Sequence, residues 1–385
     1  MGSIRSRIDY ILKHNLIIQK LYKLLMSTIF KLIGNFIKTD EKMILFNGHG
    51  RKYNDSPREI YEYIIRSNKY NDYKFVWALD EPEKYDIPHS IKIKMDTFKY
   101  FMTALKAKYW VSCVNIERGL HFKKKQTIYL NSWHGTPLKL IGNAVSGRKD
   151  FDFSSIDIFC YSGDYEKEIY KRDFNVSEDS LFLSGLPRND ALYHVSSKVI
   201  NKYKGLLNIP EDKKVILYAP TWRDSTDNGK SYVIDPPIDI NSLQKELQDD
   251  YVLLLRTHSY TNKLMGIQFN NFVRDFSAYP EINHLLIIAD VLVSDYSATI
   301  FDYAILERPI ICFGYDYFQY KNDRGFYIDL EKELPSGVIK TQEELVNKIK
   351  TMDYQNECQK TEQFKNKYLK IGGNATEMCV RKLLD

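Results

Sequence analysis

VLVSDYSATIFDYAILERPIICF, residues Val291–Phe313, is the stretch that decides the fold class. It begins with the apolar run Val291–Ser294, continues through a segment that we predict to be helical, and ends with a second apolar run, Pro309–Phe313. Short apolar runs joined by a helix are typical of parallel strands, because the connection has to cross back over the sheet. The stretch therefore predicts an α/β fold with helices on both faces of a parallel sheet.

The same alternation extends through most of the chain. In the second half we also predict strands at Val215–Ala219 and Tyr251–Arg256. The first half contains a further series of predicted strands: Met43–Asn47, Lys74–Leu79, Trp110–Val114, Thr127–Asn131, Ile156–Tyr161 and one that begins near Leu181–Ser184. A predicted helix at Lys198–Leu207 separates the two series. We therefore predict two Rossmann-like domains, residues 41–207 and 208–385, which face a cleft and bind ligands beyond the carboxyl ends of their strands.

The first 40 residues differ from the rest of the chain in charge. Up to Lys38 they hold seven Lys or Arg and one acid, Asp9, a net charge of +6, whereas the whole chain carries +5. Apolar residues recur there at helical spacing from Ile4 to Phe36 and leave a basic polar face. We predict that residues 1–40 form amphipathic helices on a membrane surface; a helix packed on its own protein is the alternative. Because the remainder is close to neutral, no nucleic-acid partner is expected.

Sequence patterns that are absent lead to two expectations, one about the location of the protein and one about metal binding. It has no apolar stretch of 18 or more residues and no signal peptide, so we expect a peripheral protein on the cytoplasmic face of the cell membrane. The five cysteines form no CxxC pair and are expected to be reduced thiols. None of the eight histidines belongs to an HxxxH or HExxH pair, so no metal site is predicted.

A histidine turn, Trp133–Pro137, follows the predicted strand Thr127–Asn131. Its order of Gly135, Thr136 and Pro137 predicts a turn into a helix with Pro near its first position. Backbone N–H groups at such a helix start bind anions. His134 would then lie beside a bound phosphate, where a histidine near its reference pKa of about 6.5 accepts a proton at neutral pH. The alternative is a loop histidine that only hydrogen-bonds the turn.

Three more predicted strand ends carry residues that suit a phosphate. They are Thr221 and Arg223 after 215–219, Arg256, Thr257 and His258 after the run 252–255, and Asp295, Ser297 and Thr299 after 291–294. An arginine can hold two phosphate oxygens at once, and a second strand-end histidine would face the first across the cleft. Hydroxyl and N–H groups at a helix start cradle phosphate, although simple capping of that helix is the alternative.

Taken together, these motifs resemble the CDP-glycerol glycerophosphotransferase family of teichoic acid synthesis. The matching pieces are Gly50–Tyr61, Trp133–Lys139, Gly185–Asp190, Tyr218–Arg223, Arg256–His258, Ser294–Asp302 and Asp323–Tyr327. They extend over most of the chain, and their combination is far more specific than any one of them. The chain lacks the large amino-terminal region of the long polymerases of this family, so it resembles the short, primase-like members.

The resemblance implies a GT-B-like fold, preceded by a basic membrane-binding element, and a set of residue roles. His134 would be the catalytic base, and His258, the second catalytic histidine, would bind donor phosphates with Arg188 and Arg223. Ser297 and Thr299 would cradle the diphosphate, and Asp302 would bind the nucleotide ribose, where GT-B donor domains commonly carry Glu. The remaining expected substrate-binding residues are Gly135, Thr136, Pro137, Thr221, Arg256, Thr257 and Asp295.

The implied reaction transfers glycerol phosphate from CDP-glycerol to a hydroxyl of a lipid-linked glycan or polyol-phosphate acceptor and releases CMP. Three alternatives remain at this point: a CDP-ribitol donor, a GT-B glycosyltransferase that uses a sugar nucleotide, and a non-catalytic glycan- or lipid-carrier-binding protein. No cofactor is firmly implied, and the role of Mg²⁺ stays open. The acceptor, the number of units added and the oligomeric state stay open as well.

Overall fold

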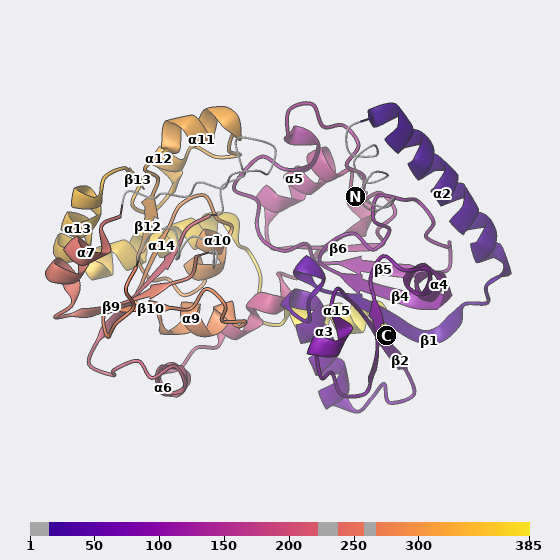
Figure 1. Ribbon diagram of the computed structural model, residues 1–385, viewed down its shortest axis with the longest axis horizontal. Helices are drawn as coiled ribbons and strands as arrows, with labels where there is room; N and C mark the ends of the chain where they lie inside the picture. The colour runs from indigo at the N-terminus through magenta and orange to yellow at the C-terminus, as the bar shows by residue number, and fades with distance from the viewer. Residues whose placement is uncertain (1–14, 222–237, 258–266) are drawn as a thin grey trace, which may run out of the picture.

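The computed structural model describes residues 15–221, 238–257 and 267–385, and it contains two α/β lobes that lie side by side (Figure 1). Each lobe is built on one sheet, and every strand pair within the described residues is parallel. The predicted α/β class with parallel sheets is therefore confirmed.

The sheet of the first lobe has seven strands. They are β1 (Asp40–Asn47), β2 (Lys74–Leu79), β3 (Ser90–Lys94), β4 (Ala107–Ser112), β5 (Ile128–Asn131), β6 (Ile158–Tyr161) and β7 (Leu181–Leu183), in the spatial order β3-β2-β1-β4-β5-β6-β7. Successive residues of β1 enter opposite faces, as strand geometry requires: Met43 and Leu45 join one buried cluster, and Ile44 and Phe46 join the other. The sheet is therefore covered on both faces.

Helices far apart in sequence provide that cover. The helices of the first lobe are α2 (Leu16–Phe36), α3 (Asp55–Ser67), α4 (Phe98–Lys106), α5 (Asp164–Phe174) and α15 (Ala375–Leu384). Phe30, Tyr100 and Tyr170 bring α2, α4 and α5 to one face of the sheet. On the other face, Ile60 of α3 packs in one cluster with Cys379 of α15.

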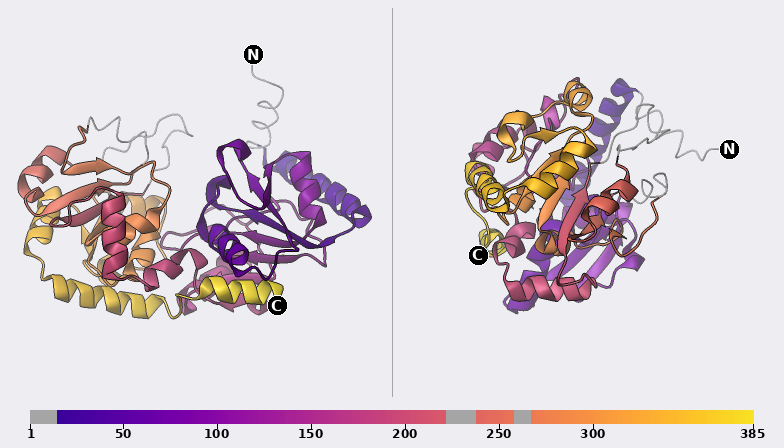
Figure 2. Two further views of the ribbon diagram at one scale, coloured as in Figure 1. Left: turned by 90° about the horizontal axis from the view of Figure 1, so that it is seen from below. Right: turned by 90° about the vertical axis from the view of Figure 1, so that its left-hand side faces the viewer.

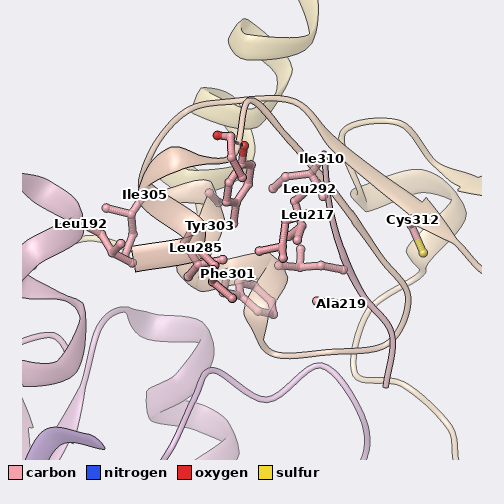
Figure 3. Packing of buried hydrophobic residues seen from close by; sticks show 14 of the residues in the cluster. Leu192, Leu217, Ala219, Leu285, Leu292, Phe301, Tyr303, Ile305, Ile310 and Cys312 are labelled. Atoms are coloured by element: carbon pink, nitrogen blue, oxygen red, sulfur yellow. Dashed lines mark hydrogen bonds between the residues drawn. The ribbon is translucent and has the colours of Figure 1, made fainter. Parts of the chain in front are cut away.

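The sheet of the second lobe has six strands. They are β8 (Lys214–Ala219), β9 (Tyr251–Leu255), β10 (Val273–Asp275), β11 (Val291–Ser294), β12 (Ile310–Phe313) and β13 (Val338–Ile339), in the spatial order β10-β9-β8-β11-β12-β13. Leu217 and Leu292 of this sheet pack with Leu285 and Phe301 in the cluster that Figure 3 shows. Ile216 joins the cluster on the opposite face.

Eight helices pack around the second sheet within the described residues. They are α6 (Ser197–Leu206), α7 (Ile240–Leu247), α9 (Ile282–Ile288), α10 (Thr299–Ala304), α11 (Tyr317–Asp323), α12 (Leu330–Glu333), α13 (Gln342–Thr351) and α14 (Tyr354–Tyr368). Leu247 of α7 and Ile349 of α13 cover one face, whereas α9, α10 and α14 supply most of the other face.

Two helices pack on the lobe opposite to the one predicted from their position in the chain. Helix α6 falls within the predicted unit 41–207, but Ile200 and Tyr203 pack on the core of the second lobe. Helix α15 falls within the predicted unit 208–385, but it lies under the first lobe, next to the end of α14 (Figure 2). The chain therefore crosses between the lobes twice, before α6 and after α14, and each crossing connects the two lobes covalently.

Helix α2 lies along the outer side of the first lobe, away from the second (Figure 1). Phe30 is 5% exposed and stacks on Phe101 of α4 with ring centroids 4.6 Å apart. The side of α2 opposite to Phe30 is exposed and carries large apolar residues. In the part of the chain that the structure describes, no helix combines the length and hydropathy that crossing a membrane requires.

Candidate active site

A sharp turn after β5 positions His134. Asn131 starts it, because its Oδ1 accepts a hydrogen bond from the backbone N–H of Trp133 at 2.8 Å. Trp133 and Gly135 both adopt positive φ, 51° and 138°. The helix predicted from Pro137 is wrong: Lys139 forms an antiparallel bridge with Phe326, and this long-range pairing keeps the backbone extended. The first lobe therefore offers no helix start to an anion at this turn.

The imidazole of His134 is half-buried, neutral and fixed in one orientation. Its Nδ1 donates a hydrogen bond to the carbonyl oxygen of Cys113 at 2.8 Å, so the lone pair remains on Nε2. The ring lies 3.9 Å from Trp133 and 4.6 Å from His49, measured between centroids. Burial, and next the charge of a protonated His49, lower the pKa of His134 to about 4. At neutral pH this histidine can accept a proton.

The two residues after Gly135 hold the turn from inside the protein. Thr136 is 1% exposed, and its hydroxyl donates a hydrogen bond to Glu166 Oε1 at 2.5 Å. The second carboxylate oxygen of Glu166 accepts from the backbone N–H of Ser162, and burial raises the pKa of this carboxyl. The hydroxyl of Tyr165 donates to the carbonyl oxygen of Pro137 at 2.5 Å. Thr136 and Pro137 thus support the position of His134 from behind.

The two lobes meet at Gly135. A Cβ atom on this residue would lie 2.8 Å from the Cβ of Ala298 and 3.1 Å from Nη2 of Arg188, so only glycine fits. Ala298 belongs to the turn that starts α10. In the same turn, Ser297 Oγ donates to Thr299 Oγ1 at 2.9 Å and accepts from the backbone N–H of Thr299 at 3.2 Å. The histidine turn and the predicted phosphate cradle are therefore neighbours.

Arg188 bridges the lobes between two carboxylates. Its Nη1 lies 3.3 Å from Asp55 Oδ2 of the first lobe, and its Nη2 lies 2.5 Å from Asp302 Oδ2 of the second. Burial alone would lower the pKa of this guanidinium, but the two carboxylates raise it above its usual range. The other oxygen of Asp302 accepts a hydrogen bond from Asn189 at 2.7 Å. Both oxygens of Asp302, the residue expected on a nucleotide ribose, are thus engaged by the first lobe.

Other predicted residues hold the strand ends of the second lobe together. Asp295 Oδ1 accepts from the backbone N–H of Thr221 at 2.7 Å. Arg256 donates through Nη1 to the carbonyl oxygen of Tyr279 at 2.6 Å, and burial lowers the pKa of its guanidinium. The backbone N–H of Thr257 donates to Ser277 Oγ at 3.2 Å. Arg223 and His258 lie outside the described residues, so their expected roles stay predictions.

A cavity of about 200 Å³ lies between the lobes, next to Arg188. Its lining includes three of the predicted site residues, Arg188, Arg256 and Asp302. It also includes seven polar residues for which no role was predicted: His49, Asn54, Asp55, Arg58, Glu59, Glu281 and Asn283. His49 could have been found by the rule that found His134, since it lies two residues after the end of the predicted strand Met43–Asn47. A larger cavity of about 550 Å³ on the second lobe has none of the predicted residues in its lining. Within the described ranges, no group of three His, Cys, Asp or Glu is placed to hold a metal ion.

Comparisons with known proteins agree with this geometry. The family model of CDP-glycerol:poly(glycerophosphate) glycerophosphotransferases matches residues 29–385. A teichoic acid glycerol-phosphate transferase of Staphylococcus aureus is 35% identical over 87% of this chain and 90% of its own length. The teichoic acid poly(glycerol phosphate) polymerase of Bacillus subtilis is 36% identical over 90% of this chain, which spans 48% of that polymerase.

A solved structure is similar over the whole chain. It is that of the wall teichoic acid polymerase TagF as a histidine-to-asparagine variant soaked with CDPG; its TM-score is 0.81, with 31% identity, and 100% of this chain and 98% of that chain are covered. The family and the fold that the motifs predicted are both confirmed. The chain belongs to the CDP-glycerol:poly(glycerophosphate) glycerophosphotransferase family.

Proposed function

We propose that the chain transfers glycerol phosphate from CDP-glycerol to a hydroxyl of a lipid-linked or polymeric cell-envelope glycan in teichoic acid synthesis, with release of CMP. The observation that carries the proposal is His134: it is neutral, held by Cys113 through Nδ1, and located where the two lobes meet. A protein that only binds a glycan has no need for a neutral, half-buried base at such a junction.

In the proposed reaction, Nε2 of His134 takes the proton of the acceptor hydroxyl. The acceptor oxygen attacks the phosphorus that carries the glycerol, a new P–O bond forms, and the bond to the bridging oxygen breaks. That oxygen leaves with CMP, which carries the electron pair; the second pKa of a phosphate monoester is about 6, so CMP departs without prior protonation. A positioned base typically contributes about 10²–10⁴-fold to such a step.

The remaining catalysis comes from holding the diphosphate and balancing its charge. We assign that task to the start of α10, with Ser297 and Thr299, and to Arg223 and His258. Ser297 and Thr299 lie in the turn whose Ala298 meets Gly135, so a phosphate held there would be close to His134. Arg188 and Asp302, which are paired with each other, act as the bridge between the lobes.

A donor screen tests the reaction. The purified chain is incubated with a lipid-linked acceptor and, separately, with CDP-glycerol, CDP-ribitol or a UDP-sugar. We expect CMP release with CDP-glycerol and a product whose mass rises by whole glycerol phosphate units. The number of units in the product also distinguishes single addition from polymerisation. UDP release from a UDP-sugar would instead favour a glycosyltransferase, and absence of turnover with every donor would favour a binding protein.

We also assign the outer side of α2 to the membrane surface. Leu21, Leu24, Leu25 and Leu32 are 57–66% exposed on this helix, an unusual apolar surface for a helix in water. Exposed lysines such as Lys20 and Lys31 accompany it, and each cation near an anionic surface contributes about 1 kcal/mol to binding. The inner side of α2 packs on its own lobe, so the membrane and packing interpretations both apply, one to each side.

Leu25→Glu should weaken binding to anionic phospholipid vesicles by about tenfold or more, because it replaces an exposed apolar side chain, which would enter the membrane, with a negative charge that the anionic lipids repel. Sedimentation with vesicles measures this. The matched control is Leu206→Glu on α6, since Leu206 and Leu25 are both 59% exposed. Equal vesicle binding by the two variants would refute the membrane role. A point variant is preferable to removal of residues 1–38, which would also remove Phe30 from the core.

A further inference from the structure

Four charged residues meet at the carboxyl edge of the first sheet. Arg51, Asp80, Asp96 and Arg118 come after β1, β2, β3 and β4, which are neighbours in that sheet. Asp96 lies between the two arginines: its Oδ2 is 2.7 Å from Arg51 Nη2, and its Oδ1 is 3.0 Å from Arg118 Nε. Arg51 Nη1 also lies 3.6 Å from Asp80 Oδ1. We call these four residues the Arg-Asp edge.

Three residues of the Arg-Asp edge hold a backbone conformation that side chains disfavour. The φ angles of Arg51, Asp96 and Arg118 are 63°, 57° and 57°. Such left-handed backbone is uncommon outside glycine, and strained residues cluster at active sites and ligand clamps. The side chains of both arginines are 35% exposed, so their ion pairs add little to stability. A network that is strained and adds little stability indicates a role in binding a ligand.

The Arg-Asp edge lies between the proposed base and the proposed membrane helix. On one side, Arg51 comes two residues after His49, whose ring centroid lies 4.6 Å from that of the base. On the other side, Arg118 precedes Gly119, where a Cβ atom would lie 3.6 Å from Cε of Lys23 on α2. An acceptor whose lipid enters the membrane at α2 and whose hydroxyl reaches the base would therefore pass along this edge.

The charges of the Arg-Asp edge suit a neutral sugar better than a phosphate. Two guanidinium groups face two carboxylates, so the four side chains carry no net charge, and the carboxylates repel an anion. Sugar hydroxyls both donate and accept hydrogen bonds, so they can accept from Arg118 and donate to Asp96. Both side chains are partly exposed, which leaves them accessible to a sugar ring.

We propose that the Arg-Asp edge binds the glycan part of a lipid-linked acceptor through its sugar hydroxyls. The proposal rests on the proposed function, because it names the part of the acceptor that joins the membrane lipid to the hydroxyl at His134. The edge adds a requirement that the donor does not impose: the acceptor has to carry sugars between its lipid and its reactive hydroxyl.

Arg118→Asn tests the glycan contact. Asparagine adopts left-handed backbone more readily than most residues, so the variant removes the guanidinium without adding strain. The probe is a disaccharide diphosphate with a short alkyl chain in place of the long lipid, and calorimetric titration measures its affinity. We expect the probe to bind about 3- to 10-fold more weakly, whereas CDP-glycerol and an alkyl diphosphate without sugars should bind as they do to the unmodified chain. Asp96→Asn, which removes the carboxylate at another left-handed position, should also weaken binding of the probe.

The matched control is Arg66→Asn on α3, because Arg66 is an exposed arginine of the same lobe and pairs with Glu62. Thermal unfolding of all three variants checks that the fold is intact. Unchanged affinity of Arg118→Asn and Asp96→Asn for the probe would overturn the proposal, and so would absence of probe binding to the unmodified chain. Equal weakening of the alkyl diphosphate would overturn it too, because the edge would then bind phosphate or lipid rather than sugars. If the unmodified chain bound the probe but released no CMP, the proposed function would fail and the glycan contact would stand.

Discussion

Replacing His134 by alanine lowers turnover with CDP-glycerol by at least about a hundredfold, whereas the affinity for CDP-glycerol is largely kept. The variant removes Nε2, the only atom of this side chain free to take a proton, since Nδ1 is bound to Cys113. It removes no group that we assign to the donor phosphates. Steady-state rates of CMP release and titration with CDP-glycerol measure the two quantities.

The pH dependence provides a second readout of the same residue. The pKa of His134 is about 4 in the protein without substrate, because burial and the neighbouring His49 disfavour the charged ring. The neutral ring is the active form, so kcat/KM should be flat near neutrality and fall as the pH drops through about 4. The negative charges of a bound diphosphate favour the imidazolium, so the corresponding decrease in kcat should occur at a higher pH.

The matched control is His121→Ala, which removes an exposed histidine of the same lobe and should leave turnover unchanged. If His134→Ala turned over at a rate close to that of this control, the assignment of the base would be wrong. A loss of donor affinity as large as the loss of turnover would also contradict it, because His134 would then act in binding rather than in proton transfer.

The central strands of both sheets could be predicted from the sequence. Lys74–Leu79 and Val291–Ser294 match β2 and β11 residue for residue, because strands covered on both faces form continuous apolar runs. The strands that were missed, β3, β10 and β13, are all edge strands. β3, with the sequence SIKIK, buries only Ile93, so its apolar content is too low to stand out.

The local conformation at the site was harder to predict, because distant segments determine it. The order Gly-Thr-Pro is compatible with a helix start, but Leu140 donates to the carbonyl oxygen of Gly325 at 3.1 Å and this pairing keeps the backbone extended. Thr136 was expected to bind substrate because it is a hydroxyl residue in the turn after a predicted strand. Its partner Glu166 lies 30 residues further along the chain, and no local pattern indicates that pairing.

The roles of charged residues depend on partners that only the folded chain brings close. Arg188 was expected to bind a phosphate, which is the common use of an arginine near a cleft. In the structure it lies between Asp55 and Asp302, which are 133 and 114 residues away in sequence. Residue type and strand-end position therefore predict where the site is, whereas ion pairs across the lobes decide which charges remain available to a ligand.

Arg188→Ala is expected to lower the free energy of unfolding by about 3–5 kcal/mol. The side chains of Asp55 and Asp302 are each only 8% exposed, so the variant leaves two buried carboxylates without their cation. Denaturant unfolding followed by circular dichroism measures the loss. The control is Arg381→Ala, which breaks a pair with Glu377 on the surface and should cost at most about 1 kcal/mol.

A second substitution separates the ion pair from simple packing. Asp302→Asn, made together with Arg188→Ala, removes one of the stranded charges but keeps the size of the side chain, so it should restore part of the lost stability. If the cost came only from the lost volume of the arginine, Asp302→Asn would restore nothing.

Because Arg188 and Asp302 belong to different lobes, a restored variant should also recover part of the alignment between the histidine turn and α10. Its rate of CMP release should therefore exceed that of Arg188→Ala alone; equal rates would contradict the role of this ion pair in positioning the two lobes.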